Sequence, residues 1–195
     1  MSPRAFFGDL PTLRTERLIL RKLSLDDAAD MFAYAREPVM TRYTTWAAHR
    51  SIDDSRGFLA EVVNKYANGQ PADFGIVLQS SGRLIGTCGI VVFNETHERG
   101  DLGYALSHEH WGRGYMTEAA RAVVDAGFRS LPLMRVQSCC HVQNVGSYRV
   151  MEKLGMRFEG TFRRYFKIGG HYHDVRFYSL LRDEWDTQQA TSRII

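Results

Sequence analysis

The chain has 195 residues, of which 44% are hydrophobic, 24% charged and 12% aromatic. This length allows a sizeable core, and the composition excludes disorder, collagen-like sequence and coiled coil as the main description. The net charge of +3, from 25 Lys and Arg against 22 Asp and Glu, is too small to indicate nucleic-acid binding. We therefore expect a single domain over residues 1–195.

The first half of the chain predicts one strand, two helices and three further strands. Charged and apolar residues alternate over 17–22, which indicates a strand. A serine followed by acids at 24–27 is typical of a helix start and predicts a helix to about residue 36. Ser51 and Asp54 resemble a capping box, which predicts a second helix to about residue 67. Three strands follow, with a hairpin turn at Ser80-Ser81-Gly82 between the first two: 73–79, 83–93 and 99–107.

The second half predicts two helices and three strands. An apolar stripe predicts a long helix over 115–129, and residues 134–142 read as a strand. A short helix over 146–154 ends at Gly155, and strands over 157–167 and 171–182 meet at a Gly-Gly turn. The order β-α-α-β-β-β-α-β-α-β-β predicts an α/β fold with a single mixed, mostly antiparallel sheet flanked by helices.

The segment Glu109-His110-Trp111-Gly112-Arg113-Gly114-Tyr115-Met116-Thr117 follows a predicted strand and opens a predicted helix. Two glycines allow the backbone to pass close to a ligand, and a helix start adds free N–H donors and partial positive charge. This combination favours phosphate binding, and Arg113 adds a cation. The segment lacks the Lys of a P-loop and the third glycine of a dinucleotide fingerprint. Such glycines also occur for backbone geometry alone.

A second segment, from Asn144 to Met156, admits two interpretations. Asn144 and Ser147 are residue types that cap a helix, and the apolar residues Val150, Met151 and Leu154 form a stripe typical of core packing. Taken alone, the segment is as consistent with a capped core helix as with a ligand contact.

In order and spacing, these segments resemble the GNAT acyltransferases, which use acetyl-coenzyme A, and within them the RimJ/RimL branch of ribosomal-protein N-terminal acetyltransferases. The resemblance covers nearly the whole chain. Four blocks carry it: Thr15-Glu16-Arg17-Leu18-Ile19-Leu20-Arg21, Trp111-Gly112-Arg113-Gly114-Tyr115 with Thr117-Glu118-Ala119, Asn144 and Ser147 with Glu152-Lys153-Leu154-Gly155-Met156, and Gly170, Asp174 and Tyr178-Ser179-Leu180-Leu181-Arg182 with Trp185.

The resemblance implies a site on this sequence. Asp101 stands where many relatives carry a Glu proposed as general base, and Glu109 stands where the superfamily usually has Gln or Arg. Ser147 is expected to donate a hydrogen bond to the coenzyme, with Tyr148 as another candidate acid. A backbone N–H near Leu106 is expected to polarise the thioester carbonyl. The implied coenzyme contacts are Leu106, Ser107, Gly112, Arg113, Gly114, Tyr115, Met116, Thr117, Asn144 and Ser147.

The implied reaction is attack of a neutral amine on the thioester, without an acyl-enzyme. A protein α-amine titrates near 7.7–8.0 and a Lys side chain near 10.4, so a distant or water-relayed base suits the α-amine better. We expect a protein N-terminus such as that of a ribosomal protein, with small-molecule amines (a drug, a polyamine or an amino acid) as the alternative. Segments 40–49 and 94–100 and the last hairpin are expected to line the acceptor site, with Tyr43, Trp46 and His49 among them.

Two other classes of function stay open. A non-catalytic acyl-coenzyme A-binding module would bind acetyl-coenzyme A and release no thiol, and a nucleotide-binding regulatory domain would need the absent phosphate-loop Lys. No metal site is expected, since Cys88, Cys139 and Cys140 have no ligand spacing and His171 and His173 lack a third ligand.

The sequence also bears on location and partners. The N-terminus lacks an apolar signal region and no apolar run nears about 18 residues, so we expect a cytoplasmic protein without a membrane span. Neither direct nucleic-acid nor membrane binding is expected, and a homodimer is possible. Residues 157–176 carry five cations and two anions, which indicates either a solvated strand face or a rim that attracts an anionic ligand.

Overall fold

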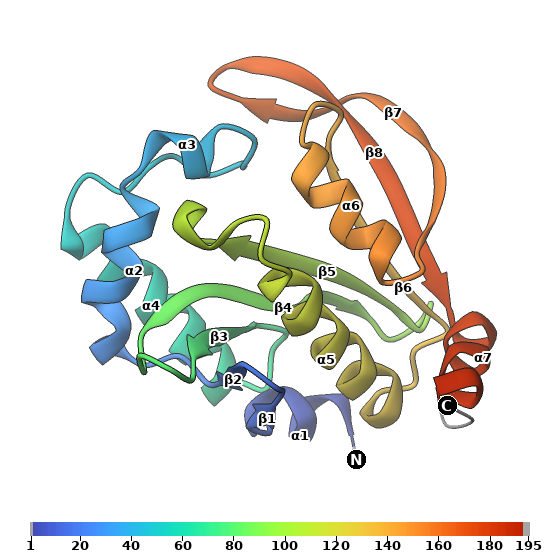
Figure 1. Ribbon diagram of the computed structural model, residues 1–195. Helices are drawn as coiled ribbons and strands as arrows, with labels where there is room; N and C mark the ends of the chain where they lie inside the picture. The colour runs from blue at the N-terminus through green and yellow to red at the C-terminus, as the bar shows by residue number, and fades with distance from the viewer. Residues whose placement is uncertain (1, 193–195) are drawn as a thin grey trace.

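The computed structural model describes residues 2–192, whose strands form one eight-stranded sheet (Figure 1). The strand order is β1-β2-β3-β4-β5-β6-β8-β7, and all neighbours are antiparallel except β5 and β6. The mixed, mostly antiparallel sheet predicted from the sequence is thus confirmed. The strands are β1 Leu13–Arg14, β2 Leu18–Arg21, β3 Asp73–Leu78, β4 Leu84–Asn94, β5 Arg99–Leu106, β6 Arg135–His141, β7 Arg157–Ile168 and β8 His171–Leu181.

The helices include the four predicted ones and add three short ones and α7, which begins at Arg182, where the strand predicted over 171–182 was expected to end. The helix predicted from residue 24 to 36 is divided into a 3₁₀ turn and an α-helix, while the capping box at Ser51 and Asp54 is present. Among the described residues, no helix has the length and apolar character of a membrane span. The helices are α1 Pro3–Gly8, η1 Leu25–Asp27, α2 Ala28–Ala35, α3 Pro38–Thr41, α4 Ile52–Ala67, η2 His108–His110, α5 Tyr115–Ser130, α6 Val145–Lys153 and α7 Arg182–Ser192.

The two faces of the sheet carry different helices. Helices α5 and α6 pack on one face, where a Cβ at Gly127 of α5 would lie 3.6 Å from Ile90 of β4. Helices α2 and α4 pack on the other, where the Tyr66 hydroxyl of α4 donates to the Asp73 carbonyl. Because side chains alternate along a strand, each sheet residue belongs to one of these two faces.

The parallel strands β5 and β6 form a fork. Their ladder pairs only Arg99–Asp101 with Arg135–Gln137, and beyond it the strands diverge (Figure 1). The other edge of β5 stays paired with β4 as far as Leu106. Residues 102–106 of β5 and 138–141 of β6 are therefore the two arms of the fork, and Asp101 lies at its vertex.

The arm formed by β5 presents a backbone donor to the fork. The Ser107 N–H donates to the Ile85 carbonyl at 2.8 Å, so the neighbouring pair Gly86–Leu106 is of the non-hydrogen-bonded kind. In such a pair the backbone polar groups point away from the partner strand. The Leu106 N–H therefore points away from β4, toward the fork.

Candidate functional site

The loop between β5 and α5 has the backbone geometry of an anion-binding turn. Gly112 and Gly114 have φ of +73° and +81°, in the left-handed region that favours glycine, and Gly114 caps α5. A Cβ built at Gly112 would meet no atom within 4 Å, so the loop surface is open there. The first N–H groups of α5 have no partner within the helix, because its turn closes only with Glu118 N–H to the Gly114 carbonyl, at 3.0 Å.

Side chains of the loop hold its shape rather than filling the open surface. The Trp111 indole N–H donates to the Leu106 carbonyl at 2.7 Å, and the Tyr115 ring lies 4.4 Å from the Arg17 guanidinium. The Met116 side chain is buried in the core. The backbone of Met116, and not its side chain, is therefore the part of this residue that is open to a ligand.

Glu118, in the first turn of α5, connects the loop to the segment between β1 and β2. Its Oε1 accepts from Thr15 Oγ1 at 2.6 Å and from Arg17 N–H at 2.9 Å, and its Oε2 pairs with the Arg17 guanidinium at 2.7 Å. Arg17 also donates to the Arg113 carbonyl at 3.0 Å. Burial raises the pKa of Glu118, but the hydrogen bonds from Thr15 and Arg17 outweigh it and hold the pKa below its usual value.

A hydrogen bond crosses the fork on the face of α6. The Tyr104 hydroxyl lies 2.9 Å from Ser147 Oγ and donates to the Ser147 carbonyl at 3.0 Å. Asn144 caps α6, since its Oδ1 accepts from Ser147 N–H at 3.2 Å. The Tyr148 ring instead faces the Arg176 guanidinium, 4.7 Å from the ring centre. Of the two candidate acids, Ser147 is thus the one whose hydroxyl reaches the fork.

Asp101 lies at the vertex of the fork on the opposite face, that of α2 and α4. Its Oδ1 accepts from Gln137 Nε2 at 2.8 Å and lies 3.8 Å from Arg99 Nε. The side chain keeps 35% of its surface exposed. The carboxylate is therefore accessible and oriented by a neutral amide, and it has one cation at ion-pair distance.

The same face carries a cluster of ring side chains at the open end of the fork. His141 ends β6, and its Nε2 lies 3.0 Å from Nδ1 of His173 on β8. The Tyr43 ring, from the segment after α3, stacks on His141 at 4.9 Å between centres. Phe162 of β7 stacks on Phe177 of β8 at 4.2 Å. The segments predicted to line the acceptor site, 40–49 and the last hairpin, both contribute to this face.

The cysteines and histidines do not form a reactive thiol or a metal site. Burial raises the pKa of Cys139 to about 12 and that of Cys140 to about 11, so neither thiol ionises near neutral pH. Among residues 2–192, no group of three or more His, Cys, Asp or Glu side chains is placed to hold a metal ion.

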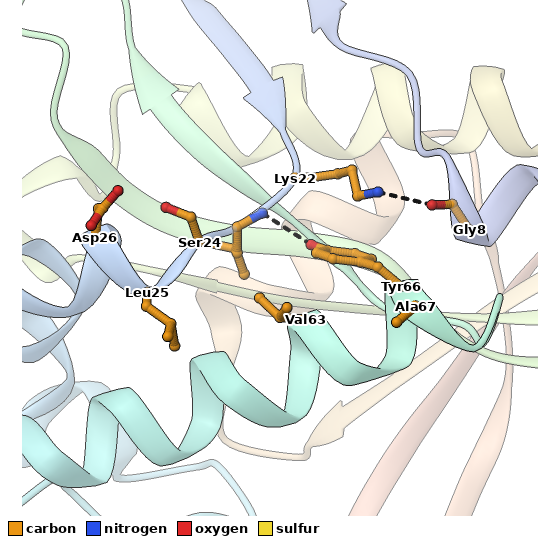
Figure 2. Close-up of a pocket in the computed structure, with 9 residues that line it drawn as sticks. Gly8, Lys22, Ser24, Leu25, Asp26, Val63, Tyr66 and Ala67 are labelled. Atoms are coloured by element: carbon orange, nitrogen blue, oxygen red, sulfur yellow. Dashed lines mark hydrogen bonds between the residues drawn. The ribbon is translucent and has the colours of Figure 1, made fainter.

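A separate hollow of about 530 Å³ lies away from the loop and the fork (Figure 2). It is bounded by residues 22–26 and α4, where Lys22 Nζ donates to the Gly8 carbonyl at 2.8 Å. The Leu23 N–H donates to the Tyr66 hydroxyl at 3.1 Å beside it. No residue of the Gly112 loop, the fork or α6 lines this hollow, so the loop and fork remain the candidate site.

The residues singled out in the sequence thus come together in two groups. Gly112 to Thr117 surround the open start of α5, and Leu106, Ser147 and Asp101 border the fork. Ser107 is buried and bonded to β4 through its N–H, at the junction of strand and loop. Sequence reasoning missed Tyr104 and the His141–His173 contact, because their partners lie about 30–40 residues away and no local pattern marks them.

Comparison with known proteins identifies the family. A sequence model described as "Acetyltransferase (GNAT) domain" matches residues 17–157. The chain belongs to the GNAT acetyltransferase family. It is 33% identical to "Uncharacterized N-acetyltransferase p20" of Bacillus licheniformis over 176 residues, which is 90% of this chain and 99% of that protein. A GNAT acetyltransferase structure from Bacillus anthracis superposes with a TM-score of 0.80 at 27% identity, covering 89% of this chain and all of the other.

Two further relatives differ in the acceptor that their names state. The "Putative ribosomal N-acetyltransferase YdaF" of Bacillus subtilis is 32% identical over 108 residues, 55% of this chain and 59% of that protein. The "Spermidine N(1)-acetyltransferase" of Escherichia coli is 28% identical over 117 residues, 60% of this chain and 62% of that protein. As a GNAT enzyme, the chain is an N-acetyltransferase with acetyl-coenzyme A as co-substrate. The open loop with its free N–H groups fits that substrate's pyrophosphate.

Proposed function

We propose that this enzyme acetylates the N-terminal α-amine of a polypeptide, such as a ribosomal protein, as a member of the RimJ/RimL branch. The relative named as a ribosomal N-acetyltransferase supports this acceptor, and the one named for spermidine provides the alternative. The observation that carries the proposal is the set of contacts made by Asp101, the carboxylate at the vertex of the fork.

The carboxylate of Asp101 is already engaged by its neighbours. Its Oδ1 accepts a hydrogen bond from Gln137 and lies at ion-pair distance from Arg99, so it is not dedicated to removing a proton from an amine. An α-amine with a pKa near 7.7–8.0 is partly neutral at pH 7 and needs little help, whereas an alkyl amine near 10.4 loses about two to three decades in its neutral fraction. The site therefore suits the α-amine.

The coenzyme is proposed to bind through backbone groups. The N–H groups of Gly112 to Thr117 face the pyrophosphate, with Arg113 as a nearby cation, and the chain of the coenzyme enters the fork beside Leu106 and Ser107. The Leu106 N–H, which points toward the fork, then donates to the thioester oxygen as negative charge develops on it. Asn144 holds the start of α6 so that Ser147 reaches the same place.

The proposed reaction is direct transfer. The amine nitrogen bonds to the thioester carbon, its proton passes to Asp101 directly or through one water, and the tetrahedral intermediate collapses by breaking the C–S bond. The departing thiolate accepts a hydrogen bond from the Ser147 hydroxyl, whose proton is otherwise donated to the Tyr104 oxygen. The high thiol pKa values of Cys139 and Cys140 support a reaction without an acyl-enzyme.

The test is a screen of acceptors for release of the coenzyme thiol. The panel holds peptides with different N-terminal residues, matched N-acetylated peptides, spermidine, an aminoglycoside and free amino acids. The proposal predicts release with free peptides and none with the blocked ones. Turnover of spermidine or another small amine, with none of the peptides, would overturn the polypeptide acceptor. Binding of acetyl-coenzyme A without release from any amine would identify a non-catalytic module.

A further inference from the structure

The hydrogen bonds of the His141–His173 pair fix where each imidazole carries its proton. The Gln143 N–H, which can only donate, points at His141 Nδ1 at 3.1 Å. His141 Nδ1 is therefore the acceptor, and the ring proton of His141 is on Nε2. His141 Nε2–H therefore donates to His173 Nδ1 at 3.0 Å, and the ring proton of His173 is on its Nε2.

This arrangement leaves the pair one free polar group. Burial and the neighbouring His173 lower the pKa of His141, which agrees with a neutral ring. No hydrogen bond found among residues 2–192 involves His173 Nε2, and the ring is only half-buried. The pair therefore offers one N–H donor and no acceptor. It can bind an oxygen atom, but it presents no lone pair to an ammonium group.

The charges around the pair disfavour a polycation as well. The Arg42 guanidinium lies 5.3 Å from the centre of the Tyr43 ring, which itself stacks on His141. The charge of Asp174 on β8 acts on His141 in the direction that raises its pKa, and the Asp174 Oδ1 accepts from Arg164 N–H of β7 at 2.8 Å. Arg163 and Arg164 are exposed on the same hairpin. A polyamine would meet these cations, whereas a neutral or acidic peptide would not be repelled.

The pair lies at a defined distance from the vertex of the fork. Asp101 pairs in register with Gln137, and His141 is four residues further along β6 on the same face. At about 3.3 Å per residue the separation from Gln137 to His141 along the strand is about 13 Å, and His173 lies beyond Val175, the register partner of His141. An extended peptide whose amine lies at Asp101 would reach His141 in about four residues and His173 in about one or two more.

Resting on the proposed function, we propose that His173 Nε2–H donates to a backbone carbonyl of a peptide acceptor, about four to six residues after the acetylated amine. His141 is a positioning residue that sets the tautomer of His173, and the Tyr43 ring keeps His141 in place. The enzyme then recognises the length of an N-terminal segment, and neither an amino acid nor a polyamine supplies the oxygen.

The experiment measures kcat and KM for a series of amidated peptides, from a single residue up to about seven residues, that share one N-terminal residue. In the wild type, kcat/KM should rise by about 2- to 12-fold when the peptide becomes long enough, which is the contribution of one net hydrogen bond. A lower KM should account for this rise. His173→Leu should remove this rise and leave the shortest peptides unchanged. His173→Gln, which keeps an N–H donor, should restore part of it, and His171→Leu, on the same strand face, should not alter it.

The outcomes separate this inference from the proposed function. A wild type that acetylates spermidine and no peptide overturns both. Peptide acetylation without dependence on length, or a rise that persists in His173→Leu, overturns the role of His173 and leaves the polypeptide acceptor in place. An equal loss for all lengths in His173→Leu also overturns it, since that is the signature of a purely structural change. Melting curves of the same samples identify a variant that has lost its fold.

Discussion

A substitution at Gly112 tests whether the loop binds the coenzyme pyrophosphate, because a matched glycine lies elsewhere in the chain. Gly112 and Gly82 have nearly equal φ, +73° and +70°, and a Cβ at either would meet nothing within 4 Å. Gly82 lies in the turn between β3 and β4. Alanine in this backbone region costs about 1–2 kcal/mol, so both variants should lose similar stability.

For a chain of this size that loss corresponds to a fall in Tm of roughly 2–8 °C. The two variants should differ in affinity. At Gly112 the added methyl occupies the open surface from which phosphate oxygens would reach the N–H groups, and we expect the Kd for acetyl-coenzyme A to rise about tenfold, or about 1.4 kcal/mol. Gly82→Ala should leave Kd unchanged.

Calorimetric titration and melting curves on the same samples provide both quantities. If Gly112→Ala binds acetyl-coenzyme A as tightly as Gly82→Ala does, the pyrophosphate is held elsewhere and the assignment of the loop is wrong. A loss of affinity in both variants would mean that reduced stability, and not the loop, explains the effect.

Three further predictions concern the fork and the loop. Asp101→Asn, which keeps the acceptor for Gln137, should lower kcat/KM for an α-amine chiefly at low pH, and parallel pH profiles of variant and wild type would exclude Asp101 as the base. Asn144→Ala should cost about 1 kcal/mol through loss of the cap, whereas Ser147→Ala should lower kcat; melting curves and turnover of both variants show whether the roles are separate. Because the pKa of Glu118 is lowered in the folded protein, its ion pair stabilises the fold above the usual value of 4.5 and this contribution is lost as pH falls through the lowered pKa. Glu118→Gln should therefore cost about 1.5–3 kcal/mol at pH 7 and much less in acid, which denaturant titrations at several pH values measure.

Local patterns predicted the elements that local interactions determine. The capping residues at Ser51 and Asp54, the apolar stripe of α5 and the glycines of the loop each act within a few residues, and the structure contains all three. The helix α7 was missed and its first residue assigned to a strand, although acids at 183 and 184 are typical of a helix start. Helices α1 and α3 are too short for a periodic pattern to reveal.

The loop half of the site was predicted because consecutive residues encode it. A strand, two glycines and a helix start follow one another in the sequence and together identify a phosphate-binding loop. The fork depends on where β5 and β6 stop pairing, and the contact of Tyr104 with Ser147 joins residues 43 apart. No spacing in the sequence encodes such contacts, since they arise only when the sheet brings distant strands together.

The hydrogen bonds of Glu118 have a consequence for the stage of folding at which the chain can bind the coenzyme. They join residues 101 apart, so the loop that follows β5 is braced by the segment between β1 and β2, which is synthesised well before the loop. Closing a segment of that length has a large entropic cost, and contacts of high sequence separation form late in folding. The nascent chain would thus contain the residues of the loop long before the loop reaches its folded conformation. Coenzyme affinity in a refolding experiment would then mark completion of the whole sheet and not the formation of one local turn.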